Sequence, residues 1–148
     1  MPPPLADAVR VYILNEAART GDVPQAAQIA AAMDLPLDAV GAAIRALAAS
    51  RALVLAPNDG QIWAAEPFCA TPSNFRIVSN GNSYWALCIW DALGVPAALH
   101  ADALVYTSCG DCGVAMELEV RDGALTQGLG VVHFGVPARR FWDNVAFT

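Results

Sequence analysis

Cys88 and Asp91 stand three residues apart in an apolar segment, and their side chains have complementary chemistry. A cysteine thiolate is a nucleophile and a ligand for soft metals, and a carboxyl group is a proton donor. The segment from Tyr84 to Leu93 predicts a helix, in which residues i and i+3 lie on one face. The pair therefore indicates a site that captures a small ligand through sulfur and delivers a proton to it.

The same pair also has a structural interpretation. Most free cysteines are buried as small apolar side chains, and an aspartate near a helix end acts as a local cap or faces solvent. Gly94 and Pro96 follow closely and predict the end of the helix. The spacing alone leaves both interpretations open.

A second pair of thiols lies further along the chain, in the turn sequence Ser108-Cys109-Gly110-Asp111-Cys112-Gly113. Such a turn can present two thiolates to one soft metal ion, but it is only half of a structural zinc site. The residues that the fold would have to add to it are Cys69, Cys88, His100 and His133. A turn with a redox-sensitive thiol pair is the alternative.

The composition restricts the class of protein. The chain has 148 residues, of which 56% are hydrophobic and 15% are charged, and its net charge is −6. An acidic chain disfavours sequence-independent binding of nucleic acid, which depends on clustered lysine and arginine. No apolar run reaches the roughly 18 residues of a membrane span, and the N-terminus lacks the pattern of a signal peptide. We therefore expect a cytoplasmic protein whose cysteines are thiols or metal ligands and form no disulfide framework.

The first part of the chain has the pattern of three helices followed by a hairpin. The predicted helices cover residues 5–18, 24–33 and 37–50, and the hairpin covers residues 52–63. This order is the winged-helix pattern, which often binds DNA. The third helix offers only Arg45, with Arg51 just beyond it, and two cations among alanines are too few to read bases.

The second part predicts a small, mostly antiparallel sheet around the helix that carries the Cys-x-x-Asp pair. The predicted strands cover residues 75–78, 103–107, 115–120 and 129–134, and a helix or tight turn is expected over 137–143. His133 is expected to be a strand histidine with a satisfied hydrogen bond. We therefore predict an α+β fold, with a winged-helix-like lobe over residues 1–66 and a second region over residues 67–148.

The order of these features resembles the organomercurial (alkylmercury) lyase family over nearly the whole chain. The segments that carry the resemblance are Ile62-Trp63, Pro67-Phe68, Thr71-Pro72, Trp85 to Pro96, Ser108-Cys109, Val132-His133-Phe134 and Pro137. Cys88 and Asp91 match the first catalytic cysteine and the catalytic aspartate of that family. Cys109 matches a family cysteine that is regarded as structural, whereas Cys69 and Cys112 have no catalytic counterpart.

The resemblance implies protonolytic cleavage of a carbon–mercury bond. Cys88 would capture R–Hg⁺, Asp91 would protonate the departing carbon, and the products would be R–H and thiolate-bound Hg(II). Apolar surroundings would strengthen both roles and raise the pKa of Asp91. No resident cofactor is required, the ligand is a small organomercurial or a soft metal ion, and small thiols accept the Hg(II).

The family also uses a second catalytic cysteine, just after a segment that resembles residues 141–148, and the sequence stops there. We therefore expect a C-terminally shortened lyase region with impaired turnover, unless Cys109 or Cys112 supplies the second thiolate. An exposed sheet edge would then favour dimerisation. Two other functions stay open. One is a non-catalytic thiol protein that binds Hg, Cu or Zn through Cys88 with Cys109 or Cys112, and the other is a winged-helix regulator.

Overall fold

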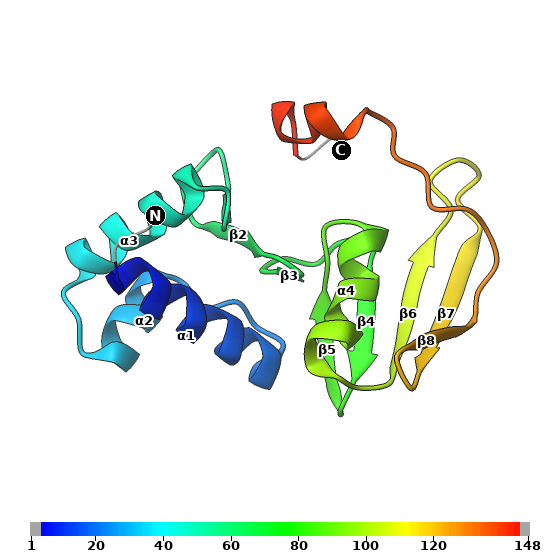
Figure 1. Cartoon of the computed structure of the whole chain (residues 1–148), viewed down its shortest axis with the longest axis horizontal. Helices are drawn as coiled ribbons and strands as arrows, with labels where there is room; N and C mark the ends of the chain where they lie inside the picture. Colours follow the sequence, from blue (N-terminus) through cyan, green and yellow to red (C-terminus); the bar gives the residue numbers. More distant parts are fainter. Residues whose placement is uncertain (1–3, 146–148) are drawn as a thin grey trace.

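Three helices form the first third of the chain, and the remainder contains the strands, a fourth helix and a short 3₁₀ helix (Figure 1). The computed structural model describes residues 4–145. The helices are α1 (Pro4–Thr20), α2 (Ala26–Met33), α3 (Leu37–Ala49), α4 (Ile89–Leu99) and the 3₁₀ helix η1 (Ala138–Asp143). The strands are β1 (Val54–Leu55), β2 (Ile62–Ala65), β3 (Phe68–Cys69), β4 (Arg76–Ser79), β5 (Asn82–Trp85), β6 (Ala103–Ser108), β7 (Ala115–Arg121) and β8 (Ala124–Gln127). Within the described range, no helix is long and apolar enough to cross a membrane.

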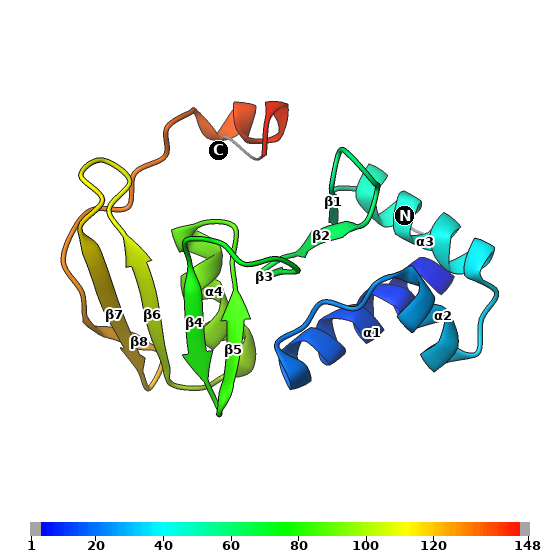
Figure 2. The same cartoon turned by 180° about the vertical axis from the view of Figure 1, so that it is seen from behind.

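These strands join one sheet in the order β1-β2-β3-β5-β4-β6-β7-β8, and each neighbouring pair is antiparallel. Helix α4 covers one face of strands β4 and β5, as the two opposite views show (Figures 1 and 2). Helices α1 to α3 gather beside the β1–β3 end of the sheet (Figure 1). The predicted α+β class is confirmed.

Helices α1 to α3 form because their apolar side chains recur at helical spacing and face a shared core. The completely buried residues of these helices include Val9, Ile13, Ile29, Val40 and Leu47. The three predicted helices and the hairpin of β1 and β2 are therefore confirmed. Strand β2 also pairs with β3, so this hairpin belongs to the main sheet as well. The winged-helix assignment and the domain boundary after residue 66 stay predictions.

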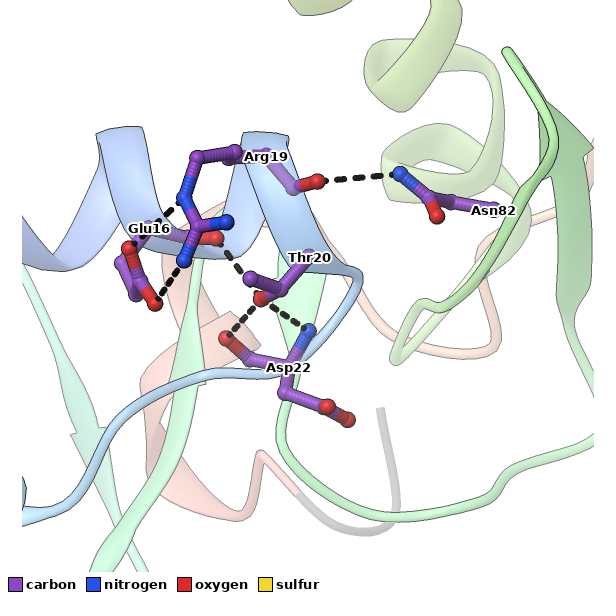
Figure 3. A network of polar contacts seen from close by, with 5 residues as sticks. All are labelled: Glu16, Arg19, Thr20, Asp22 and Asn82. Atoms are coloured by element: carbon purple, nitrogen blue, oxygen red, sulfur yellow. Dashed lines mark hydrogen bonds and ion pairs between the residues drawn. The ribbon is translucent and has the colours of Figure 1, made fainter.

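The C-terminal end of α1 is docked on the hairpin of β4 and β5. Asn82 Nδ2 donates a hydrogen bond to the backbone oxygen of Arg19 at 3.0 Å, beside the ion pair of Arg19 with Glu16 at 2.6 Å (Figure 3). The hydroxyl of Tyr84 donates to the backbone oxygen of Ala18 at 2.8 Å. Tyr84 is buried, so water does not compete for its hydrogen bond. These contacts join the helical region to the strand that leads into Cys88.

Gly21 allows this close approach, and its substitution is expected to loosen the docking. Its φ is +87°, and a Cβ added there would overlap the backbone oxygen of Ser83. An alanine at positive φ costs about 1–3 kcal/mol. We expect Gly21→Ala to lower the free energy of unfolding by more than this amount, because the overlap adds to the backbone cost. Denaturant titration measures the loss.

Gly81→Ala is the matched control for that prediction. Gly81 has a φ of +79°, but a Cβ added there would meet no atom within 4 Å. The control therefore carries the backbone cost without the overlap. Equal losses of stability in the two variants would contradict a close approach of α1 to β5.

The predicted start of the Cys88 helix is wrong. Tyr84 and Trp85 belong to strand β5, which pairs with β4, and the helix begins only at Ile89. The short apolar segment is compatible with a helix or with a strand. Its pairing with β4 stabilises the strand. Cys88 therefore lies just before the helix and not within it.

Gly94 and Pro96 do not end α4, contrary to the prediction. Pro96 lacks the N–H of an intrahelical hydrogen bond, but it is buried together with Val95, and this packing offsets the loss. A Cβ added at Gly94 would lie 3.2 Å from Cβ of Pro67, so the glycine lets the chain pass close to α4. The helix ends instead at Leu99.

The predicted strand over residues 129–134 is also wrong. The last strand of the described chain is β8, and the apolar run after it forms no strand. Leu129 and Val131 are 88% and 92% exposed. Apolar residues favour a strand only where a neighbouring strand pairs with them, and residues 4–145 contain none for this run. His133 is therefore not a strand histidine.

Candidate active site

Cys88 is the N-cap of α4, and Asp91 is the third residue of that helix. The backbone of Cys88 is extended, and its Sγ accepts a hydrogen bond from the backbone N–H of Asp91 at 3.4 Å. An N-cap side chain reaches the backbone of the third helical residue, which explains why a three-residue spacing brings the groups together.

Burial sets the protonation of both groups. It raises the pKa of the Cys88 thiol and outweighs the backbone N–H of Asp91, which lowers that pKa. The free thiol therefore keeps its proton at neutral pH, although a helix N-terminus favours the thiolate. Burial, followed by repulsion from the Glu66 carboxylate, raises the pKa of Asp91 to about 6. Near that pH, about half of the Asp91 side chains carry a proton that they can donate.

Glu66 is a residue of this site that the sequence analysis missed. Its carboxylate raises the pKa of Asp91, and burial raises its own pKa. The contact of Pro67 with Gly94 places Glu66 against α4, beside Asp91. The available signal was a single charge within the apolar run 62–70.

Removal of the Glu66 charge is expected to lower the pKa of Asp91. In Glu66→Gln the repulsion between two carboxylates disappears, so the pKa falls from about 6 toward the ordinary value of 3.8. It stays above that value because burial remains. A titration of the Asp91 carboxyl carbon by NMR measures the shift without an activity assay. Glu117→Gln, at an exposed strand position, is the control, and an identical Asp91 pKa in both variants would contradict the coupling.

Cys88 lines a cavity of about 390 Å³. Its walls come from strands β2 and β3, the loop after β3, the start of α4 and the C-terminal segment. The residues that line it include Trp63, Cys69, Thr71, Cys88, His133 and Phe134. Asp91 does not itself line the cavity. It lies next to Cys88, which does. The arrangement places a thiol and a proton donor at the side of a space with largely apolar and aromatic walls.

The C-terminal segment forms one wall of the cavity and is anchored on both sides. The ring of Phe134 lies 6.5 Å from that of Trp90 at the start of α4. The guanidinium of Arg51 lies 5.4 Å from the ring centre of Trp142, which ties η1 to the end of α3. Figure 1 shows η1 above the space between α3 and α4. These two contacts hold the segment at the wall of the cavity.

The family of the chain follows from its sequence in this region. The sequence model for alkylmercury lyase matches residues 68–148, which is more than half of the chain and includes Cys88 and Asp91. The chain belongs to the alkylmercury lyase family. The resemblance stated from the sequence is confirmed.

A solved structure supports the fold of this alkylmercury lyase region and of the helices before it. The crystal structure of the mercury-bound form of MerB2 is similar to this chain with a TM-score of 0.68 and 22% identity. The similarity covers 85% of this chain and 60% of that chain, so this chain spans less than two thirds of its length. No curated protein matches the sequence.

Cys109 and Cys112 lie in the loop between β6 and β7 of the lyase region. The pKa of Cys109 is lowered, mainly by the backbone N–H groups of Cys112 and Asp111 and then by the Cys112 thiol. Neither Cys109 nor Cys112 lines the cavity beside Cys88. Residues 4–145 contain no cluster of three or more cysteine, histidine or carboxylate side chains that is arranged to hold a metal ion.

Proposed function

We propose that this member of the alkylmercury lyase family cleaves carbon–mercury bonds by protonolysis at Cys88 and Asp91. The observation that carries the proposal is the hydrogen bond from the backbone N–H of Asp91 to Cys88 Sγ at 3.4 Å, which holds the two residues together beside the cavity that Cys88 lines. Cys88 would capture mercury, and the neighbouring Asp91 would protonate the carbon. The mercury-bound MerB2 structure supports mercury as the ligand class.

The reaction begins when the Cys88 thiol exchanges its proton for R–Hg⁺, which forms a sulfur–mercury bond and releases H⁺. Asp91 in its acid form then gives its proton to the carbon bound to mercury. The electron pair of the carbon–mercury bond moves to that carbon, so R–H leaves and Hg(II) stays on sulfur. Asp91 is left as a carboxylate, and its raised pKa favours recovery of a proton from water.

The walls of the cavity suit both ligand and chemistry. Trp63, Phe75 and Phe134 are among the lining residues, so a hydrocarbon group replaces water when it enters. Exclusion of water strengthens the electrostatic interactions between substrate and protein. Small thiols then remove Hg(II) from the protein, and we place the reaction in the cytoplasm, where such thiols are kept reduced.

The test is incubation of the purified chain with phenylmercury and an excess of a small thiol, with benzene measured over time. We expect benzene release beyond one equivalent, because the thiol carries Hg(II) away and frees Cys88 for another turnover. Absence of benzene, with mercury held stoichiometrically, would refute the lyase proposal and favour a metal-binding protein.

That second function, binding of a soft metal without catalysis, is favoured by the Cys109 thiol, whose pKa is lowered by backbone N–H groups of its loop, with Cys112 three residues away in the same loop. Two thiols in one turn are a common ligand set for Hg(II), Cu(I) or Zn(II). In this case the Cys109→Ser and Cys112→Ser double variant would lose stoichiometric metal binding, whereas Asp91→Asn would keep it.

A further inference from the structure

We propose that Cys69 and Cys88 together form a two-sulfur site that holds Hg(II) in the cavity. This inference rests on the proposed function for its biological meaning, but the site is defined by the structure. Both residues line the same cavity, although they come from different elements and lie far apart in the sequence. Cys69 belongs to β3 and Cys88 caps α4.

Hydrogen bonds hold the two sides of this cavity together. Cys69 lies opposite Trp85 where β3 pairs with β5, and the chain reaches Cys88 three residues after Trp85. In the loop that follows Cys69, Ser73 Oγ donates to the backbone oxygen of Ala86 at 2.6 Å. The segments that carry the two thiols are therefore connected on both sides, and the sheet fixes their relative position.

The surroundings of Cys69 suit a sulfur ligand. Its side chain is only 2% exposed, so it is reached through the cavity. Trp63 Nε1 can only donate, and it donates to Thr71 Oγ1 at 3.2 Å. The Thr71 hydroxyl hydrogen is then free to point toward Sγ of Cys69, which lies 3.6 Å from Thr71 Oγ1. A donor in this position remains favourable when the sulfur carries the negative charge of a metal-bound thiolate.

The chemistry of Hg(II) needs no more than these two ligands. A soft divalent ion prefers thiolate sulfur and is satisfied by two of them. Each thiol releases one proton and forms one sulfur–mercury bond, and nothing is oxidised or reduced. The second bond places more electron density on a mercury-bound carbon and also retains Hg(II) after R–H leaves. Cys109 and Cys112 do not line this cavity, so they are the matched thiols for a control.

The experiment uses the full chain with Cys109→Ser and Cys112→Ser, so that only Cys69 and Cys88 remain as thiols. One equivalent of HgCl₂ is added, and X-ray absorption counts the sulfur neighbours of mercury. We expect two sulfurs in this protein and one after the further change Cys69→Ser. One sulfur while Cys69 is still present would overturn the proposal, and this arm does not depend on how well the Cys69 variant folds.

Transfer of Hg(II) to an added monothiol gives a second readout. Loss of a residue that only hydrogen-bonds a metal ligand lowers metal affinity by roughly 10–100-fold. Cys69→Ser removes a direct ligand, so we expect the extent of Hg(II) transfer to rise by at least roughly 10–100-fold. Equal transfer with and without Cys69 would overturn the site. Both readouts use inorganic Hg(II) and do not depend on cleavage of a carbon–mercury bond. A chain that holds Hg(II) with two sulfurs but releases no benzene would therefore refute the lyase proposal and leave the two-sulfur site standing.

Discussion

Asp91→Asn is expected to reduce benzene release from phenylmercury by about 100–10,000-fold, the usual contribution of a positioned proton donor. Asparagine has nearly the same shape as aspartate. Its backbone N–H can still donate a hydrogen bond to Cys88 Sγ, so the cap of α4 remains. It has no acidic proton to give to the carbon. Mercury capture by Cys88 should therefore persist while product formation is lost, and mass spectrometry of the intact protein measures the captured R–Hg⁺.

The pH dependence of the unmodified chain adds a second check on Asp91. The acid form donates, and its pKa is about 6, so the chemical step should slow as the pH rises through 6 toward 8. Asp91→Asn should lose this dependence along with the rate. Benzene release by Asp91→Asn at the rate of the unmodified chain would remove Asp91 from the mechanism.

Cys88→Ser is expected to abolish benzene release, with a loss of at least about 1,000-fold in rate. Serine oxygen is a hard ligand and replaces sulfur poorly at a soft metal. Serine is also a preferred N-cap residue, so its hydroxyl can accept the hydrogen bond from the Asp91 backbone and α4 should stay intact. The effect is therefore one of chemistry and not of folding, and thermal unfolding of the variant checks this point.

Cys112→Ser is the matched control for Cys88→Ser. Cys112 is exposed and lies outside the cavity, so its loss should leave benzene release within about twofold of the unmodified chain. Equal losses in the two variants would assign capture to the loop thiols and contradict the role of Cys88.

Local information was sufficient for several features of this protein. Helices α1 to α3 follow from apolar residues at helical spacing, and β6 and β7 follow from β-branched and alternating patterns. The pair of Cys88 and Asp91 could be recognised because a spacing of three residues brings side chains together both on a helix and at its N-cap. The prediction was therefore right about proximity although the helix starts later than expected.

Features that depend on contacts with other segments of the chain could not be predicted from the local sequence pattern. Tyr84 is a strand residue because β4 pairs with it, and Pro96 stays within α4 because packing offsets its missing hydrogen bond. The apolar run after β8 has a strand-like pattern but no pairing partner among residues 4–145. In each case the structure depends on a contact outside the segment whose pattern was read, and that pattern does not contain the contact.

The proximity of Cys88 and Asp91 and the family of the chain were thus determined by the sequence alone, since both depend on residue types at short spacing. Only the tertiary structure decided that Glu66 acts on Asp91 and that Cys69 lies beside the same cavity as Cys88. Sheet pairing across β2, β3 and β5, and the packing of the Glu66–Pro67 turn on α4, produce these proximities. Electrostatic coupling and metal ligation depend on distance in space, and the fold alone sets that distance.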